Sequence, residues 1–273
     1  MFLFYSGYGI YFSIKNKEGY MRAFLLKRLL PVWFSFAICV CFFLVENLCM
    51  GVTFGVENTL LAFTGWTSIG NDNWYMFVTF VLYIFAYFSF RFFNPDKRLL
   101  GLIIFTCLSL GLVAALYFLK SDSGNWWWNT LLCLPLGMWY CHFKDKIDSF
   151  LFKSLGFYFL GLGISVALCI GGFFLTRIHP IFYCLYSMSV SLFIVVVTAK
   201  LRFRSIPLSL IGKHVFSIYI FQRLVFRAGQ ALGLNANPYL FFVGCLAVTL
   251  TIAFGYDWAF NFARSRLPFK SAA

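Results

Sequence analysis

The sequence predicts an all-α fold: a polytopic bundle of transmembrane helices with about eight full spans and a partial span at the N-terminus. The first observation behind this prediction is composition. Hydrophobic residues make up 62% of the 273 residues and charged residues only 11%, whereas the surface of a soluble domain needs far more charge. The second is that the apolar residues gather in runs of about 18 or more, the length that crosses a hydrocarbon core about 30 Å thick.

The apolar runs define the predicted spans in chain order. They cover residues 29–50, 74–92, 99–119, 127–142, 151–175, 180–198, 207–229 and 237–260. The runs are too long for strands and show no alternation of period two, which argues against a β-barrel. Because no linker is long enough to hold a soluble domain, residues 1–273 are predicted to form a single integral-membrane domain. The longest non-cytoplasmic loop, residues 51–73, is expected to form a partly structured cap.

Basic residues predict the orientation of the spans. When residues 14–28 are placed in the cytoplasm, the segments on that side hold 18 of the 22 Lys and Arg residues. These residues are Lys15, Lys17, Arg22, Lys27, Arg28, Arg91, Lys97, Arg98, Lys144, Lys146, Lys153, Lys200, Arg202, Arg204, Lys213, Arg264, Arg266 and Lys270. The positive-inside rule is therefore satisfied at every crossing. The formal charge of +13 follows from topology and does not indicate nucleic acid, since the basic residues are spread over five segments.

The first apolar run, residues 1–13, is too short to cross a membrane. At 1.5 Å per residue it covers about 20 Å, against a core of about 30 Å. It also lacks the basic start of a signal peptide. We therefore expect it to be the second half of a helix whose beginning precedes the chain, the alternative being a short re-entrant segment. Its small residues Ser6, Gly7 and Gly9 are of the kind that let membrane helices approach closely.

The cysteines and histidines do not form a metal-binding pattern. Nine cysteines are scattered without a C-x-x-C pair, and we expect buried free thiols. The three histidines, at positions 142, 179 and 214, are far apart in the sequence. No structural metal site is therefore predicted.

One predicted span carries a polar stripe. Tyr219, Arg223 and Arg227 follow one another at i,i+4 spacing and share a helix face. Ionisable groups inside a bilayer usually face a cavity or one another, so a polar ligand such as a sugar or a lipid phosphate is one occupant to consider. Snorkelling of both arginines to the outer interface is the alternative. His214, about one turn earlier, is either a proton carrier or a solvated residue at the interface.

Four stretches, taken in order, resemble the membrane acyltransferase-3 family. They are residues 4–10 (FYSGYGI), 20–31 (YMRAFLLKRLLP), 73–76 (NWYM) and 211–222 (IGKHVFSIYIFQ), with residues 133–138 (CLPLGM) as a further partial match. Each stretch alone is weak, and their order and spacing together are fairly specific. The resemblance covers essentially the whole chain.

The resemblance implies a membrane-embedded O-acyltransferase. Such a protein moves an acyl group, acetyl by default, from acyl-CoA to a hydroxyl of a cell-surface carbohydrate or glycolipid. Acyl-CoA is then a co-substrate, and no bound cofactor is expected. The expected partners are membrane lipids, acyl-CoA and a carbohydrate or glycolipid acceptor, without nucleic acid. The expected location is a bacterial inner membrane, crossed several times.

The resemblance also implies roles for particular residues. Because acyl-CoA is polyanionic and cytoplasmic, basic residues at the cytoplasmic end are expected to hold its phosphates. The expected donor-binding residues are Tyr20, Arg22, Lys27 and Arg28. Enforcing topology and meeting anionic lipid is the other explanation for these basic residues. The expected acceptor-binding residues are Trp74, Gln222, Arg223 and Arg227.

The catalytic residue is the point at which this chain departs from the family pattern. Relatives carry a catalytic His in a first helix that would lie before residue 1, and many have His where this chain has Gln222. Gln cannot shuttle protons near neutral pH. His214 and Tyr219 are the remaining weak candidates for a catalytic role.

Two functions from other classes stay open at this point. One is a transporter or exporter of carbohydrate or lipid, in which the polar stripe lines a pathway and no acyl donor is needed. The other is a catalytically inactive, truncated relative of the acyltransferases. Binding of CoA separates the first alternative from the enzyme, and an upstream helix that carries His separates the second.

Overall fold

The computed structural model describes residues 1–92, 97–201 and 205–266, and every regular element within these ranges is a helix. Arg202, Arg204 and Lys270, which the charge pattern places in cytoplasmic segments, lie outside the described residues, as does the side chain of Arg264. The chain divides into two compact units. The first unit contains residues 1–30 and 78–201, and the second contains residues 31–77 and those from 205 onward.

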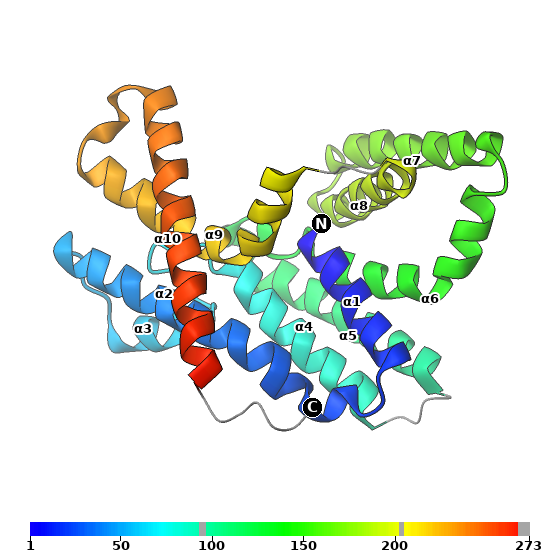
Figure 1. The fold of residues 1–273 in the computed structure, drawn as a ribbon, viewed down its shortest axis with the longest axis horizontal. Coiled ribbons are helices and arrows are strands. Elements are labelled where there is room, and N and C mark those ends of the chain that lie inside the picture. The colour runs from blue at the N-terminus through cyan, green and yellow to red at the C-terminus, as the bar shows by residue number, and fades with distance from the viewer. Residues whose placement is uncertain (93–96, 202–204, 267–273) are drawn as a thin grey trace. The chain divides into compact units, whose positions relative to one another are not determined.

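Each unit combines helices from separate parts of the chain, which Figure 1 labels in order. The first unit holds α1 (Phe2–Asn16), most of α4 (Trp74–Arg91), α5 (Arg98–Leu119), α6 (Cys133–Leu151), α7 (Leu155–Thr176) and α8 (Tyr183–Lys200). The second unit holds α2 (Leu30–Cys49), the short α3 (Val56–Ala62), α9 (Ile206–Ala231) and α10 (Pro238–Arg266).

Six helical segments among the described residues are long and apolar enough to cross a membrane. They are Leu25–Cys49, Trp74–Arg91, Arg98–Leu119, Leu155–Thr176, Pro180–Lys200 and Pro238–Ala263. The prediction of an all-α membrane bundle is confirmed, and these six segments correspond to six of the eight predicted spans. The other two predicted spans fall on α6 and α9, which are less apolar on average than the helices of these six segments.

The predicted boundaries of one span, residues 127–142, are wrong. Asn125–Trp127 form a single 3-10 turn, and the helix begins only at Cys133 and continues to Leu151. Apolar side chains before Cys133 suggested a span, but Trp128 is buried without being helical. At its other end α6 continues through charged residues, where Lys144 pairs with Asp148 one turn later. Such i,i+4 pairs favour a helix that hydropathy alone does not detect.

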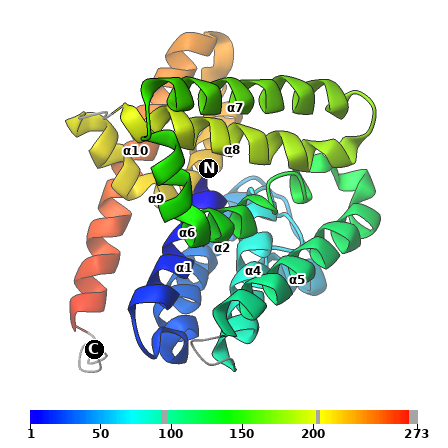
Figure 2. The same cartoon turned by 90° about the vertical axis from the view of Figure 1, so that its right-hand side faces the viewer.

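Two glycines allow α1 and α6 of the first unit to pack closely (Figures 1 and 2). A Cβ on Gly7 would lie 2.0 Å from the carbonyl oxygen of Leu134, and a Cβ on Gly137 would lie 2.0 Å from that of Phe4. The expectation that Gly7 permits close helix approach is confirmed. The same expectation for Gly9 is wrong, because a Cβ there would meet no described atom within 4 Å.

Serine side chains cap the N-termini of α7 and α9, the first helix of two packed helix pairs. The Ser154 hydroxyl accepts a hydrogen bond from the Phe157 N–H at 3.4 Å and caps α7, which packs against α8 (Figure 2). The Ser205 hydroxyl accepts one from the Leu208 N–H at 3.5 Å and caps α9, which packs against α10. These caps satisfy N–H groups that the first helical turn leaves free.

The loop of residues 51–73 is partly structured, as predicted. It contains α3, and its polar turn is held by buried amides at both ends. Asn47 Nδ2 donates to the Ile69 carbonyl at 2.7 Å, and Asn73 Nδ2 donates to the Gly65 carbonyl at 2.8 Å. The loop is therefore tied to the end of α2 within the second unit.

Candidate functional site

A partly open cavity of about 500 Å³ lies in the first unit, beside the turn that follows α1. The chain reverses at Gly19, whose φ of 66° lies in the left-handed region that glycine adopts without strain. The charged side chains that line the cavity are Lys17, Glu18, Arg22, Arg91 and Arg98. We refer to it as the basic cavity.

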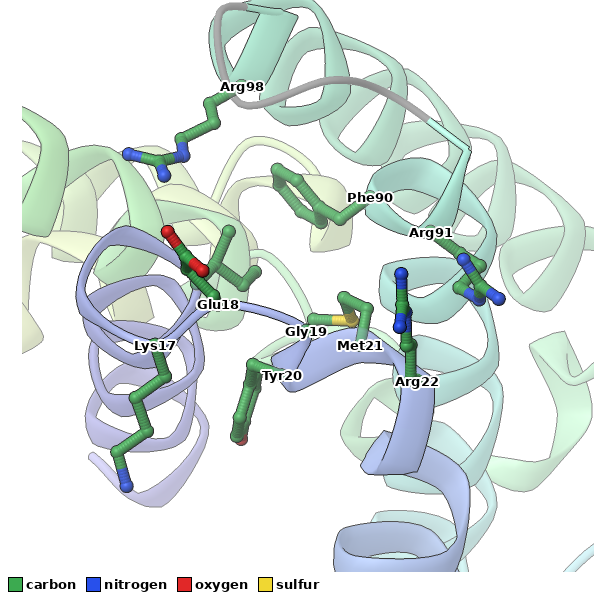
Figure 3. A pocket seen from close by; sticks show the side chains of 10 residues that line it. Lys17, Glu18, Gly19, Tyr20, Met21, Arg22, Phe90, Arg91 and Arg98 are labelled. Carbon is green, nitrogen blue, oxygen red and sulfur yellow. The ribbon is translucent and has the colours of Figure 1, made fainter. Parts of the chain in front are cut away.

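Figure 3 shows how the charged groups of the basic cavity are arranged. Arg22 and Arg91 lie on one side, and Arg98 faces Glu18 on the other. Lys17 points away from the centre. Four cations against one carboxylate leave an excess of positive charge, which suits a ligand with several negative charges.

The basic cavity includes two of the four residues expected to bind the donor, Tyr20 and Arg22. Arg28 lies outside the lining and contacts it through Tyr20, because Arg28 Nε donates to the Tyr20 hydroxyl at 3.3 Å. Lys27 is exposed and is not part of the lining.

Sequence reasoning missed the contribution of Arg91 and Arg98 to this site. The sequence pattern indicates only a topological role for both. The positive-inside pattern already placed them on the same side of the membrane as Arg22. It could not show that the end of α4 and the start of α5 lie beside the turn after α1.

The polar stripe of α9 contacts the loop before α4 and the end of α2, all within the second unit. The Tyr219 hydroxyl donates to the backbone carbonyl of Asp72 at 3.2 Å, and Arg223 pairs with the Asp72 carboxylate. Arg227 Nη1 lies 3.2 Å from Glu46 Oε2, and its Nη2 donates to Asn47 Oδ1 at 2.7 Å. We call these six residues, Glu46, Asn47, Asp72, Tyr219, Arg223 and Arg227, the outer polar cluster.

A glycine makes the approach of Arg227 possible. Gly70 has a φ of 109°, and a Cβ at this position would lie 1.6 Å from Arg227 Nη1. Without that Cβ, Arg227 Nη1 also donates to the Ile69 carbonyl at 3.2 Å. Both arginines of the stripe are thus paired with acids. The sequence pointed to the arginines but did not identify Asp72 and Glu46 as their partners.

The two other residues expected at the acceptor site lie on α4 and α9. Trp74 is half-buried, with its ring centroid 5.9 Å from that of Tyr75, and Tyr75 in turn contacts the Tyr219 ring at 5.2 Å. Gln222 is half-buried, and the structure shows no polar contact between its side chain and the described residues. Trp74 therefore joins the outer polar cluster through aromatic contacts.

His214 is held by an acid on the neighbouring helix. Its Nδ1 lies 2.5 Å from Asp257 Oδ2, and the Ser217 hydroxyl donates to Asp257 Oδ1 at 2.5 Å. A carboxylate on one ring nitrogen orients the imidazole and leaves the other nitrogen for proton transfer. Tyr219 is a weaker candidate for a catalytic role, because its hydroxyl is already bonded to the Asp72 backbone. Within the ranges that the structure describes, no group of three or more His, Cys, Asp or Glu is placed to hold a metal ion.

Comparison with known proteins gives one result. A family model described as an acyltransferase domain matches residues 1–258. Neither a curated protein nor a solved structure matches the chain significantly. The family match includes the basic cavity, the outer polar cluster and the His214–Asp257 pair.

Proposed function

This chain belongs to the acyltransferase-3 family, and from this membership we propose that it transfers an acyl group from acyl-CoA to a hydroxyl of a cell-surface carbohydrate or glycolipid. Acetyl is the default acyl group. The family supports acyltransferase activity in general, and the apolar helices indicate a multi-pass integral membrane protein. We propose a bacterial inner membrane as its location, with membrane lipids and the two substrates as its partners.

The observation that carries this proposal is the charge of the basic cavity. Three arginines from two separate chain segments, with Lys17, line a space of about 500 Å³. Guanidinium groups bind phosphate oxygens through paired hydrogen bonds, and CoA presents several phosphates. If the residues had only a topological role, they would not need to gather around a common cavity. Tyr20 and Arg22 therefore remain donor-binding residues in this proposal, joined by Arg91 and Arg98.

The reaction needs a base that removes the proton of the acceptor hydroxyl, and the leaving CoA thiolate must be protonated. The hydroxyl oxygen attacks the thioester carbonyl carbon, the new C–O bond forms and the C–S bond breaks. The proton of the hydroxyl passes by way of the base to the CoA sulfur. We propose His214 as that base, because Asp257 holds Nδ1 and Nε2 makes no hydrogen bond with the described residues.

The acceptor is proposed to bind at the outer polar cluster. Trp74 and Tyr75 supply aromatic surface beside Tyr219, and Arg223 is half-exposed. Polar side chains next to aromatic rings are typical of sites that hold sugars by stacking and hydrogen bonds. Gln222 and Arg227 stay assigned to this site as binding residues.

The test is transfer of labelled acetyl from acetyl-CoA into carbohydrate in membrane vesicles that contain the protein. We expect transfer by the wild type, and at least about a tenfold loss of transfer at low acetyl-CoA for Arg22→Ala, because a hydrogen bond to a charged group is removed. Lys146→Ala is the matched control, since Lys146 is an exposed basic residue of a predicted cytoplasmic segment and lies outside the lining of the basic cavity. Equal loss in both variants, or no transfer by the wild type, would contradict the proposal.

A further inference from the structure

We propose that the outer polar cluster selects an uncharged, hydroxyl-bearing group of the acceptor, and that Glu46 accepts a hydrogen bond from that hydroxyl. This inference deepens the proposed function and rests on it for the identity of the acceptor site. It assigns a binding role to Glu46 and a selectivity role to Asp72. An anionic acceptor group, such as a phosphate, is expected to bind poorly.

The charges of the cluster argue against an anionic ligand. Its two arginines are matched by two acids, Arg223 by Asp72 and Arg227 by Glu46. A phosphate would have to displace a carboxylate from its arginine or approach it as a like charge. Sites that bind phosphate instead present arginines that are free to form paired hydrogen bonds. The basic cavity has such an excess of cations, and the outer polar cluster does not.

Glu46 has hydrogen-bonding capacity that the described residues do not use. Its side chain is only 9% exposed, yet neither carboxylate oxygen accepts a hydrogen bond within the described ranges. Arg227 lies 3.2 Å away as an ion-pair partner, without the geometry of a hydrogen bond. An ionised carboxylate can accept about four hydrogen bonds, and buried acceptors are normally satisfied. A ligand hydroxyl would supply the missing donor.

Asn71, the residue before Asp72, is also buried and has an unused hydrogen-bond donor, whereas Glu46 has an unused acceptor. Asn71 is 2% exposed as a residue, and its side-chain Nδ2 donates to none of the described residues. Its Oδ1 accepts from the Ile69 N–H at 3.1 Å, and the Ile69 carbonyl receives Arg227. The network thus contains an unmet acceptor and an unmet donor. A hydroxyl both donates and accepts, whereas a phosphate dianion only accepts.

The position of the network fits the non-cytoplasmic end of the spans. Glu46 lies sixteen residues after Leu30, which at 1.5 Å per residue is about 24 Å along α2. The rings of Tyr75 and Tyr219 lie next to Asp72, with centroids 5.2 Å apart. Aromatic surface and hydroxyl-binding groups therefore come from the same unit, as a sugar-binding site requires.

The experiment measures sugar binding to the protein in lipid nanodiscs free of glycoside detergent. Methyl β-glucoside is the uncharged probe and glucose 6-phosphate the anionic probe, each titrated by saturation-transfer NMR. We expect the wild type to bind methyl β-glucoside more tightly. Glu46→Gln should weaken that binding about tenfold, because the charged acceptor is replaced by a neutral amide oxygen that forms a weaker hydrogen bond. Glu57→Gln is the matched control, since Glu57 is an exposed acid of α3 outside the cluster.

A second variant tests selectivity and does not depend on a buried residue. Asp72→Asn leaves Arg223 without its acid, and should raise the affinity for glucose 6-phosphate severalfold relative to methyl β-glucoside. If Glu46→Gln does not fold, Asp72→Asn at this partly exposed pair still tests the selectivity of the cluster.

The inference is overturned if the wild type prefers glucose 6-phosphate or binds neither probe. It is also overturned if Glu46→Gln binds like Glu57→Gln, or if Asp72→Asn leaves the preference unchanged. Sugar binding that follows the expected pattern without acetyl transfer from acetyl-CoA would support the acceptor site and contradict the enzyme assignment. The two proposals can therefore fail separately.

Discussion

Replacement of Gly7 by Ala should destabilise the first unit at the contact between α1 and α6. The added Cβ would lie 2.0 Å from the Leu134 carbonyl oxygen, which is backbone and cannot rotate away. Overpacking of this kind costs about 1–3 kcal/mol. At Gly9 the same change meets no described atom within 4 Å, and it gains up to about 1 kcal/mol of helix propensity. Because the gain in helix propensity applies at both positions of α1 and cancels, the two variants should differ in free energy of unfolding by about 1–3 kcal/mol.

The assay is thermal unfolding of both variants in nanodiscs, followed by tryptophan fluorescence. For a chain of this size, 1 kcal/mol corresponds to about 2–4 °C, so Gly7→Ala should unfold about 2–12 °C below Gly9→Ala. Because α1 leads directly into the turn that lines the basic cavity, Gly7→Ala should also weaken acetyl-CoA binding. A midpoint for Gly7→Ala at or above that of Gly9→Ala would refute the close contact.

Three further predictions follow from other contacts. Asp257→Asn should lower the free energy of unfolding by about 1–2 kcal/mol in the same thermal assay, because the part-buried contact with His214 is weakened. Asp145→Asn is the control, and it should change the free energy of unfolding by less than about 0.5 kcal/mol because its pair with Lys15 is exposed. Gly70→Ala should lower the unfolding midpoint, since its Cβ would displace Arg227, and an unchanged midpoint would argue against that approach. Raising salt from about 50 to 500 mM should weaken acetyl-CoA binding severalfold in calorimetry, while binding of methyl β-glucoside stays unchanged.

The sequence was sufficient to predict the membrane bundle, because the apolar runs and the alternating basic clusters are properties of composition and order. The predicted helix boundaries are wrong at residues 127–142, where the ends of the apolar run do not coincide with the ends of the helix. Buried Trp127 and Trp128 precede the helix instead of forming its first turns. The Lys144–Asp148 pair then extends α6 beyond the apolar stretch.

The candidate sites were predictable in part, for a physical reason. A residue's own chemistry is visible in sequence, so Arg22, Arg223 and Arg227 could be singled out. Their partners come from other segments, and only the tertiary fold brings Arg91 and Arg98 to the basic cavity or Glu46 to Arg227. Helix periodicity correctly grouped the stripe of α9 on one face, but periodicity carries no information about Asp72 on the facing loop.

The most direct test of the account is calorimetric binding of acetyl-CoA to the protein in nanodiscs, with the wild type compared with the double variant Arg22→Ala and Arg98→Ala. Both arginines line the basic cavity, and each lost charge-assisted contact should weaken binding about tenfold or more. We predict binding by the wild type and a combined loss of about a hundredfold or more. Equal affinity in the two proteins, or no binding by the wild type, would contradict the central claim that this cavity holds the acyl donor.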